Sequence, residues 1–536
     1  MRLRVTHIIL SFTIAATVCA CTSVKTSEKE QGIVQLKSGK ISGILLDSAT
    51  NLRAFKGIPY AEPPLGALRW KAPRPVQNWD NVLACTNFSK WCPQRAREAY
   101  PYEKSEDCLC LNVWTDNIGG NEKLPVLVWI HGGGLSTLAS NYKPFVNGVT
   151  FAKKGIILVS INYRLGALGF LAHPGLSAES ENNVSGNYGY LDQLEALRWV
   201  QENIASFGGD PDNVTIFGNS AGGTSVATLC ASPLSKGLFH KAIMQSPWMF
   251  GGGDKKAVPN IARLRDSLAS LPSAEQLGTV WAQTFVNEGE DALKKLRSLD
   301  VDQIINEVSF QTKTTIDGWF LHDYPEAVFR KGNQMDIPVI IGSNKEEGNY
   351  YLRSVRSRTQ EEFTERISGF YKGAAADISG FYSFNSEEEA KIAVGQYITD
   401  AWFLEPADHL VQEMENVTSP AYQYEFVVPL LENPSLGAVH ASEIQYVYNQ
   451  LGSEASEEVK TVGEAMISYW TQFAKTGNPN QPGLPQWEAY TKNQKSYLEI
   501  GKTITPKTEL LNAARRRIRE EKVRAYERAT QMNNEK

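Results

Sequence analysis

A serine flanked by glycines, in the stretch VTIFGNSAGGTSVATLCAS at residues 214–232, is the segment best suited to do chemistry. A β-branched apolar run precedes Gly218, and the small apolar residues after Ser220 can continue as a helix. A serine on so sharp a turn needs glycine neighbours, because a Cβ there would collide with the adjacent backbone. Gly218, Ser220 and Gly222 therefore predict a nucleophilic serine at the end of a strand, with a plain glycine-rich turn as the alternative.

Such a nucleophile needs a base to accept its proton and a third group to orient that base. His440 lies in a loop of glycine and small residues, from which its side chain can reach a cleft. Glu346 and Glu347 directly follow the apolar run IPVIIGSN and are the acid candidates, with solvated turn carboxylates as the alternative. The chain order serine, acid, histidine is that of α/β-hydrolases.

An acyl-transfer enzyme also needs hydrogen-bond donors for the oxyanion. The stretch WIHGGGL ends an apolar run with three glycines, whose backbone N–H groups can face a substrate unobstructed. Each such donor contributes about 10²–10³-fold to the rate. A triple glycine could also bind phosphate, but no P-loop lysine follows at the required spacing.

The elements that must position these residues alternate along the chain. Five apolar runs are typical of parallel strands covered on both faces, at residues 124–131, 155–164, 214–217, 241–246 and 337–344. Helical patterns lie among them, one ending at Gly208 and another at Gly477. We therefore expect an α/β fold. Residues 254–310 and 353–420 are expected to be helical insertions, and the charged tail 514–531 a solvated surface helix.

The chain has 536 residues, of which 42% are hydrophobic, and this is enough for a large core. Its net charge of −5 gives no reason to expect nucleic-acid binding. We expect no metal and no cofactor. Cys85, Cys92, Cys108 and Cys110 form no paired C-x-x-C pattern, so disulfides are the better interpretation, whereas Cys230 is expected to be a buried small hydrophobe.

The N-terminus predicts export. Two arginines precede the apolar run IILSFTIAATV, which indicates a signal peptide over residues 1–20. The sequence VCAC resembles a bacterial lipobox, so we expect Cys21 to be lipidated, residues 21–31 to be a tether and residues 32–536 to form one domain. The protein would then be a lipoprotein anchored to a membrane of the cell envelope. Ordinary cleavage after Ala20, giving a periplasmic or secreted protein, is the alternative.

Long motifs in a common order resemble the type B carboxylesterases, the family that includes cholinesterases, bile-salt lipases and bacterial esterases. The motifs are FKGIPYAEPPLGALRW, SEDCLCLNVW, NYRLGALGFL, GNYGYLDQLEALRWVQENIASFGGDP, IFGNSAGG, GSNKEEG and GAVHASEI. The resemblance implies an α/β-hydrolase fold, with a mostly parallel central sheet and helical insertions. It also implies a serine esterase that acts through an acyl-enzyme on small-molecule esters.

The resemblance assigns roles to single residues. Ser220 would be the nucleophile, Glu347 the acid and His440 the base. The implied oxyanion-hole donors are Gly133, Gly134 and Ala221. The remaining implied pairs are a disulfide between Cys92 and Cys108 and an ion pair between Glu106 and Arg164. Whether Cys85 and Cys110 also pair is left open.

Two departures from the family bear on the substrate. Asn219 stands where the family usually has a glutamate, and the loop from Cys92 to Cys108 lacks the tryptophan with which cholinesterases hold choline. Both changes remove attraction for a quaternary ammonium group, so we expect neutral, short- to medium-chain esters. Trp248 and Phe250 follow the run 241–246 and are pocket candidates together with Asn219, with core packing as the alternative. A catalytically inactive binding protein of this fold and a long-chain lipase are the competing functions.

Overall fold

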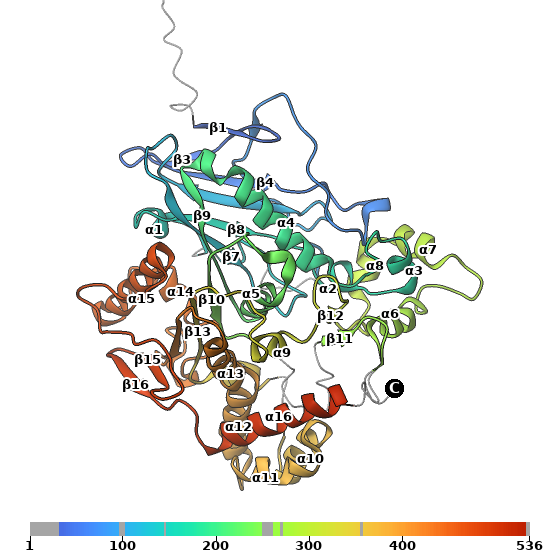
Figure 1. Cartoon of the computed structure of the whole chain (residues 1–536), viewed down its shortest axis with the longest axis vertical. Coiled ribbons are helices and arrows are strands. Elements are labelled where there is room, and N and C mark those ends of the chain that lie inside the picture. The colour runs from blue at the N-terminus through green and yellow to red at the C-terminus, as the bar shows by residue number, and fades with distance from the viewer. Residues whose placement is uncertain are drawn as a thin grey trace, which may run out of the picture.

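The computed structural model describes residues 32–95, 102–143, 146–248, 261–267, 272–353 and 357–531. Its centre is an 11-stranded sheet in the order β16-β15-β14-β13-β10-β9-β7-β8-β6-β4-β3 (Figure 1). The run from β8 to β15 is parallel throughout, and the pairs at both ends of the sheet are antiparallel. This architecture confirms the predicted α/β-hydrolase fold with a mostly parallel central sheet.

All five predicted strands are present at the middle of this sheet. They are β7 (Leu124–Ile130), β8 (Ile157–Ile161), β9 (Gly209–Asn219), β10 (Lys241–Gln245) and β13 (Val339–Asn344). Successive side chains of β9 enter different clusters of the core, since Ile216 packs in one and Phe217 in the other. The sheet is therefore buried on both faces, as the continuous apolar runs indicated.

The outer strands complete the sheet. They are β3 (Ile44–Asp47), β4 (Leu52–Pro59), β6 (Cys110–Thr115), β14 (Ala421–Phe426), β15 (Ser496–Ile500) and β16 (Ile504–Thr508). A separate small sheet contains β1 (Ile33–Leu36), β2 (Gly39–Ser42) and β5 (Leu83–Ala84).

The two helices that the sequence predicted are present, and each ends at the predicted glycine. The first is α4 (Tyr188–Asn203), which continues as the 3₁₀ turn η2 (Ile204–Phe207) and stops at Gly208 with φ of 82°. The last is α15 (Glu457–Thr476), which stops at Gly477 with φ of 79°. Both glycines adopt the left-handed conformation that closes helices at low steric cost. Shorter helices are α1 (Val149–Ala152), α2 (Gly166–Phe170), α3 (Pro174–Ala178), α5 (Ala221–Ala231), α9 (Pro325–Arg330) and α14 (Ile444–Val447).

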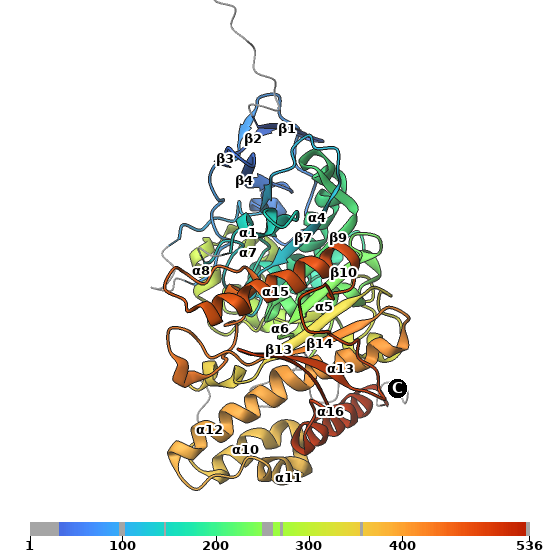
Figure 2. The same cartoon turned by 90° about the vertical axis from the view of Figure 1, so that its left-hand side faces the viewer.

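Two insertions surround the sheet. The first contains α6 (Ala274–Ala282), α7 (Ala292–Ser298) and α8 (Val301–Asn306). It also contains a strand that was not expected, β11 (Ile261–Arg263), which pairs with β12 (Thr314–Ile316). The second forms the helical lobe seen below the sheet in Figure 2. Its helices are α10 (Gln360–Tyr371), α11 (Ala375–Gly380) and α12 (Glu387–Ile398), and the insertion ends with α13 (Glu405–Glu413), which packs against β13 and β14 of the sheet.

The prediction of a solvated C-terminal helix is wrong. The helix α16 (Ala513–Gln531) docks on the helical lobe (Figure 2), and Ile518 has no exposed surface. Arg515 Nε lies 2.8 Å from Asp400 Oδ1, and Lys522 Nζ lies 2.7 Å from Glu405 Oε2. The charge run suggested solvent because its acidic partners lie more than a hundred positions earlier in the chain.

The implied ion pair between Glu106 and Arg164 is also wrong. Arg164 instead binds Asp192 through both Nη2 and Nε, at 2.7 and 2.8 Å, and the Asp192 side chain is fully buried. Glu106 accepts hydrogen bonds from Arg69, at 2.7 and 2.5 Å. Arg164 and Glu106 therefore each have a partner of opposite charge. The ion pair of Arg164 connects the segment after β8 to α4, and not to the disulfide loop that contains Glu106.

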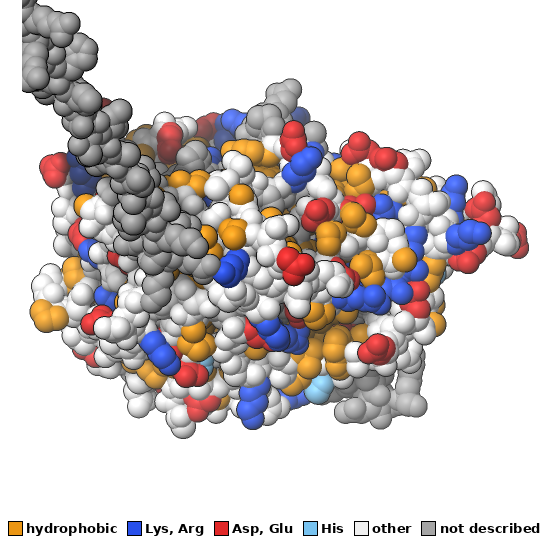
Figure 3. Space-filling model, turned by 90° about the horizontal axis from the view of Figure 1, so that it is seen from above, with side chains coloured by type: hydrophobic (Ala, Val, Ile, Leu, Met, Phe, Trp, Pro, Cys, Tyr) orange, Lys and Arg blue, Asp and Glu red, His pale blue; other side chains and the backbone are white. Residues whose placement is uncertain are grey.

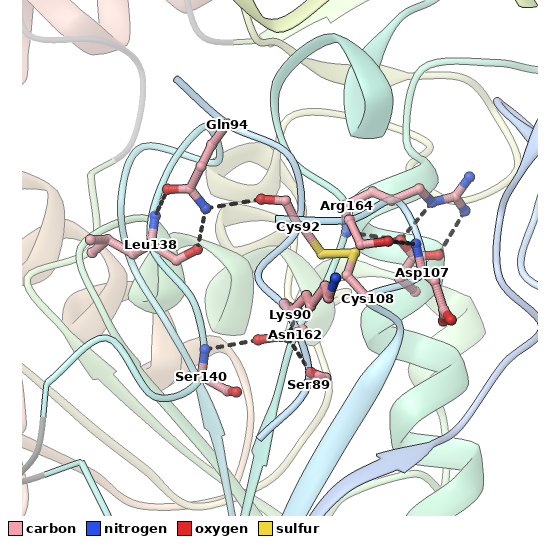
Figure 4. Close-up of a disulfide and its surroundings, with 12 residues drawn as sticks. Ser89, Lys90, Cys92, Gln94, Asp107, Cys108, Leu138, Ser140, Asn162 and Arg164 are labelled. Carbon is pink, nitrogen blue, oxygen red and sulfur yellow. Dashed lines mark hydrogen bonds and ion pairs between the residues drawn. A yellow bond between two sulfur atoms is a disulfide. The ribbon is translucent and has the colours of Figure 1, made fainter. Parts of the chain in front are cut away.

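A disulfide joins Cys92 and Cys108 (Figure 4). The chain between them spans 16 positions, and closing a loop of this size contributes about 3 kcal/mol on the chain-entropy model. Cys85 and Cys110 are buried, unpaired thiols, and burial raises the pKa of each to about 12. Cys230 is buried in α5, as expected.

The surface seen from the end that carries β1 mixes basic and acidic side chains with small apolar patches (Figure 3). No helix within the described residues is both long and apolar enough to cross a lipid bilayer. The predicted signal peptide, tether and Cys21 lie outside the described residues, and so does Phe250.

Candidate active site

The turn between β9 and α5 holds Ser220 in a strained conformation, with φ of 59° and ψ of −125°. The chain can fold this tightly because glycines meet there: a Cβ on Gly218 would lie 2.6 Å from the carbonyl oxygen of Ile130, and one on Gly222 only 2.1 Å from it. The N–H of Ser220 donates to the carbonyl of Gln245 on β10, at 2.9 Å. The glycine pattern thus has the steric cause expected of a nucleophile elbow.

The loop after β7 lies directly against this turn. A Cβ on Gly132 would come within 3.1 Å of Ser220 Cβ, and one on Gly133 within 2.1 Å of the Thr137 carbonyl oxygen. Gly134, with φ of 64°, faces open space. Among the described residues, no hydrogen bond occupies the N–H groups of Gly133 or Gly134. These groups are therefore available to an acceptor in the pocket, as is the N–H of the first residue of α5, Ala221, which has no partner within its helix.

His440 and Glu347 come together from loops that follow β14 and β13. Glu347 Oε2 lies 2.5 Å from His440 Nδ1, and Glu347 is fully buried. Its other oxygen, Oε1, accepts hydrogen bonds from Ser246 Oγ at 2.5 Å and from the N–H of Asn344 at 2.8 Å. A carboxylate on Nδ1 fixes the imidazole tautomer and leaves Nε2 as the basic nitrogen.

Glu346 points elsewhere. Its Oε2 accepts a hydrogen bond from the N–H of Ala438 at 2.8 Å, so it braces the loop that leads to His440. The two neighbouring glutamates thus have separate partners, and only Glu347 contacts the histidine.

One pocket, with a volume of ≈ 460 Å³, brings the predicted residues together. Ser220, His440, Gly133 and Gly134 line it, and so does Asn219. No hydrogen bond between described residues joins Ser220 to His440; such contacts are often long in free enzymes and tighten with substrate.

Aromatic side chains form much of the wall of this pocket. They are Tyr142, Trp248, Tyr350, Tyr351, Trp402 and Phe403. The Phe403 ring lies 4.6 Å from the His440 ring, and the Trp248 ring 6.0 Å from that of Trp402. Trp248 lines the same pocket as Ser220 and also packs against the core cluster of the helical lobe, so its role as a substrate-pocket residue stays a prediction.

Sequence reasoning missed a second buried carboxylate, that of Glu443. It accepts hydrogen bonds from the side-chain amides of Asn219, Gln245 and Asn344, at 2.7, 2.9 and 2.8 Å. Burial and the nearby Glu347 raise the pKa of Glu443. No local pattern marked it: residues 440–443 form a turn in which Ala441 has φ of 67°, so helical spacing does not relate Glu443 to His440.

The described part of the chain contains no cluster of His, Cys, Asp and Glu that could hold a metal ion. The chemistry that the pocket offers is that of a serine, an imidazole with a buried carboxylate, and backbone N–H donors.

Comparisons with known proteins agree with this geometry. The model of the carboxylesterase family matches residues 30–524. The para-nitrobenzyl esterase of Bacillus subtilis (strain 168) is 34% identical over 489 residues, covering 88% of this chain and 95% of its own. The fumonisin B1 esterase of Sphingopyxis macrogoltabida is 33% identical over 486 residues, covering 85% of this chain and 84% of its own. A solved PNB esterase superposes with a TM-score of 0.78 at 31% identity, covering 91% of this chain and all of that one.

Fold and site together define an α/β-hydrolase. The chain belongs to the carboxylesterase family and is a carboxylic ester hydrolase.

The two adjacent glutamates allow a matched test. Glu347→Gln removes the carboxylate from His440 Nδ1 and should lower kcat by about 10³–10⁴-fold, because the amide favours the wrong tautomer. Glu346→Gln keeps an acceptor for the Ala438 N–H and should stay within about threefold of wild type. Steady-state hydrolysis of p-nitrophenyl butyrate by both purified variants measures this, and a larger loss in Glu346→Gln would contradict the assignment.

Proposed function

We propose that the enzyme hydrolyses esters through an acyl-enzyme formed on Ser220, with His440 as general base and Glu347 as the acid that orients it. The observation that carries the proposal is the 2.5 Å contact between Glu347 Oε2 and His440 Nδ1, in a pocket that also holds Ser220. A buried carboxylate in this position stabilises the imidazolium that forms when the serine loses its proton.

The steps follow from these positions. His440 Nε2 takes the hydroxyl proton while Ser220 Oγ attacks the ester carbonyl carbon. The carbonyl oxygen becomes an anion, and the N–H groups of Gly133, Gly134 and Ala221 donate to it. His440 then gives the proton to the departing alcohol. Water repeats the sequence on the acyl-enzyme and releases the acid.

Replacing the nucleophile tests the proposal. Ser220→Ala should lower kcat by at least about 10⁴-fold, because no other group can form the covalent intermediate. A fluorophosphonate probe should label the wild-type protein at Ser220, as read by peptide mass spectrometry, and should leave Ser220→Ala unlabelled. Label on another residue, or robust turnover by the variant, would end the serine mechanism.

The substrate we propose is a neutral, short- to medium-chain ester. The pocket volume of ≈ 460 Å³ is within the range of sites for small molecules. The carboxylate nearest Asn219 is Glu443, which is fully buried and hydrogen bonded to three amides. Glu432 and Lys143 both line the pocket, so the wall carries charges of opposite sign.

A charged ester and its neutral isostere test this preference. The kcat/KM for 3,3-dimethylbutyl butyrate should equal or exceed that for butyrylcholine at both low and high salt, because Glu432, the acidic residue among the described residues that line the pocket, shares the wall with the cationic Lys143. A tenfold preference for butyrylcholine that fades as salt rises would mean that a carboxylate attracts the cation. Glu432→Gln would then show whether that carboxylate is Glu432.

The proposal extends to location: the mature protein is held in the cell envelope by acyl groups on Cys21. Support comes from the lipobox-like VCAC after an apolar run. Several acyl chains on one cysteine give stable anchoring.

Expression of the full chain in a bacterial host tests the anchor. Wild type and Cys19→Ser should fractionate with membranes, and Cys21→Ser should not, because it lacks the thiol to be acylated. Mass spectrometry of the mature N-terminus should show the acyl groups. An unmodified Cys21 in soluble protein would instead establish ordinary cleavage after Ala20.

A further inference from the structure

The side chain of Gln94, in the disulfide loop, binds the backbone of the loop that follows β7. Its Oε1 accepts a hydrogen bond from the N–H of Leu138 at 2.7 Å, and its Nε2 donates to the carbonyl of the same residue at 2.8 Å (Figure 4). Gln94 is 6% exposed and follows Cys92 of the disulfide by two positions, and its Nε2 also donates to the Cys92 carbonyl at 3.1 Å. One buried amide thus satisfies both backbone polar groups of Leu138.

Leu138 holds a strained backbone conformation. Its φ of 75° lies in the left-handed region, which a leucine adopts only at a steric cost. Such a conformation persists where the surroundings over-determine it. Gln94 does this, because the Leu138 N–H belongs to the peptide group before the residue and the Leu138 carbonyl to the peptide group after it.

The peptide group between Thr137 and Leu138 also contacts Gly133. In a trans peptide the carbonyl points opposite to the N–H, so the hydrogen bond from Leu138 to Gln94 turns the Thr137 carbonyl to the other side. There it packs on Gly133, since a Cβ on that glycine would lie 2.1 Å from the carbonyl oxygen. The position of Gly133 therefore depends on the orientation that Gln94 gives to this peptide group.

Hydrogen bonds within the same turn orient the peptide group between Gly133 and Gly134. The carbonyl of Gly133 accepts from the N–H groups of Ser136 and Thr137, at 3.1 and 3.0 Å, and from Thr137 Oγ1 at 3.0 Å. The N–H of Gly134 lies on the opposite side of this peptide plane, so it points away from the turn, and Gly134 lines the pocket. The direction of this proposed oxyanion-hole donor thus depends on where residues 136–138 lie.

We propose that Gln94 is a positioning residue for the oxyanion hole. Through Leu138, it holds residues 133–138 in the form that presents the Gly134 N–H to the substrate carbonyl. Gln94 is not among the described residues that line the pocket, so it acts through the backbone alone. The proposal rests on the acyl-enzyme mechanism above. Misplacing a catalytic group by about 1 Å can cost about 10²-fold in rate, so a small shift of this turn is enough to matter.

Gln334 offers a matched control. It is also 6% exposed, and its Nε2 also donates to a backbone carbonyl, that of Glu413 at the end of α13, at 3.2 Å. It too is absent from the described residues that line the pocket. Gln94→Met and Gln334→Met each replace a buried amide by an unbranched apolar chain of similar length, so a difference between them reports on the contact with Leu138.

The experiment measures kcat and KM for p-nitrophenyl butyrate and the Ki of two inhibitors. A trifluoromethyl ketone with a butyl chain adds to the serine and carries an oxyanion, whereas butyl p-nitrophenyl ether has no carbonyl and reports on ground-state binding. Gln94→Met should lower kcat by about 10–10²-fold, leave KM within about twofold and weaken the ketone by about the same factor as kcat. The ether should bind as it does to wild type, and Gln334→Met should keep the wild-type kcat and both Ki values.

A second variant covers the case in which Gln94→Met does not fold, as judged by thermal unfolding. Gln94→Glu keeps an acceptor for the Leu138 N–H but has no donor for the Leu138 carbonyl, and the nearby Lys104 ammonium, which donates to the Gln94 carbonyl at 2.7 Å, compensates its charge. This variant should therefore also weaken the ketone more than the ether.

Equal weakening of the ketone and the ether, or a loss of kcat no larger than that of Gln334→Met, would overturn the proposal and leave Gln94 a packing residue. Wild-type enzyme keeps this outcome apart from failure of the mechanism. If the ketone does not inhibit wild type and a fluorophosphonate does not label it at Ser220, the acyl-enzyme mechanism itself is wrong.

Discussion

The burial of Glu347 is the constraint that shapes the whole site. A carboxylate without exposed surface must receive its hydrogen bonds from donors of the protein itself. Leaving a buried ion unsatisfied costs several kcal/mol, so its hydrogen bonds are obligatory. Ser246 supplies one from the end of β10, Asn344 another from the end of β13, and His440 the third from a loop after β14. Three strand ends must therefore meet at one edge of the sheet, and the parallel order β10-β13-β14 brings them there.

Glu443 places a second buried carboxyl group in the same region, and its hydrogen-bond partners are of a different kind. Its three donors are all side-chain amides, which bring hydrogen bonds without a positive charge. A glutamate at position 219 would set two carboxylates against each other, and only one of them could ionise readily. Asn219 removes that conflict and donates to Glu443 instead. The departure from the family pattern thus has a local cause, independent of any effect on substrate choice.

Features with a short-range cause were predictable from the sequence. The glycines around Ser220, the apolar strands and the helix ends at Gly208 and Gly477 each express a steric or burial rule that acts within a few residues. Contacts between side chains that are distant in the sequence could not be predicted in this way. The family pattern implied that Arg164 pairs with Glu106, but its partner is Asp192. No spacing rule distinguishes these two carboxylates, because each can reach Arg164 only in the folded chain.

The C-terminal helix shows how far such long-range contacts extend toward the pocket. Trp402 and Phe403, which line it, belong to a π-helical turn η6 (Thr399–Leu404), a form that often occurs at functional sites. Two side chains of α16 bind this irregular turn. Arg515 binds the buried Asp400, and Lys522 Nζ donates to the carbonyl of Ala401 at 2.6 Å. Both contacts fall on the two residues directly before Trp402. The charged tail, which looks like a solvated appendage in the sequence, therefore fixes the aromatic wall that packs against His440.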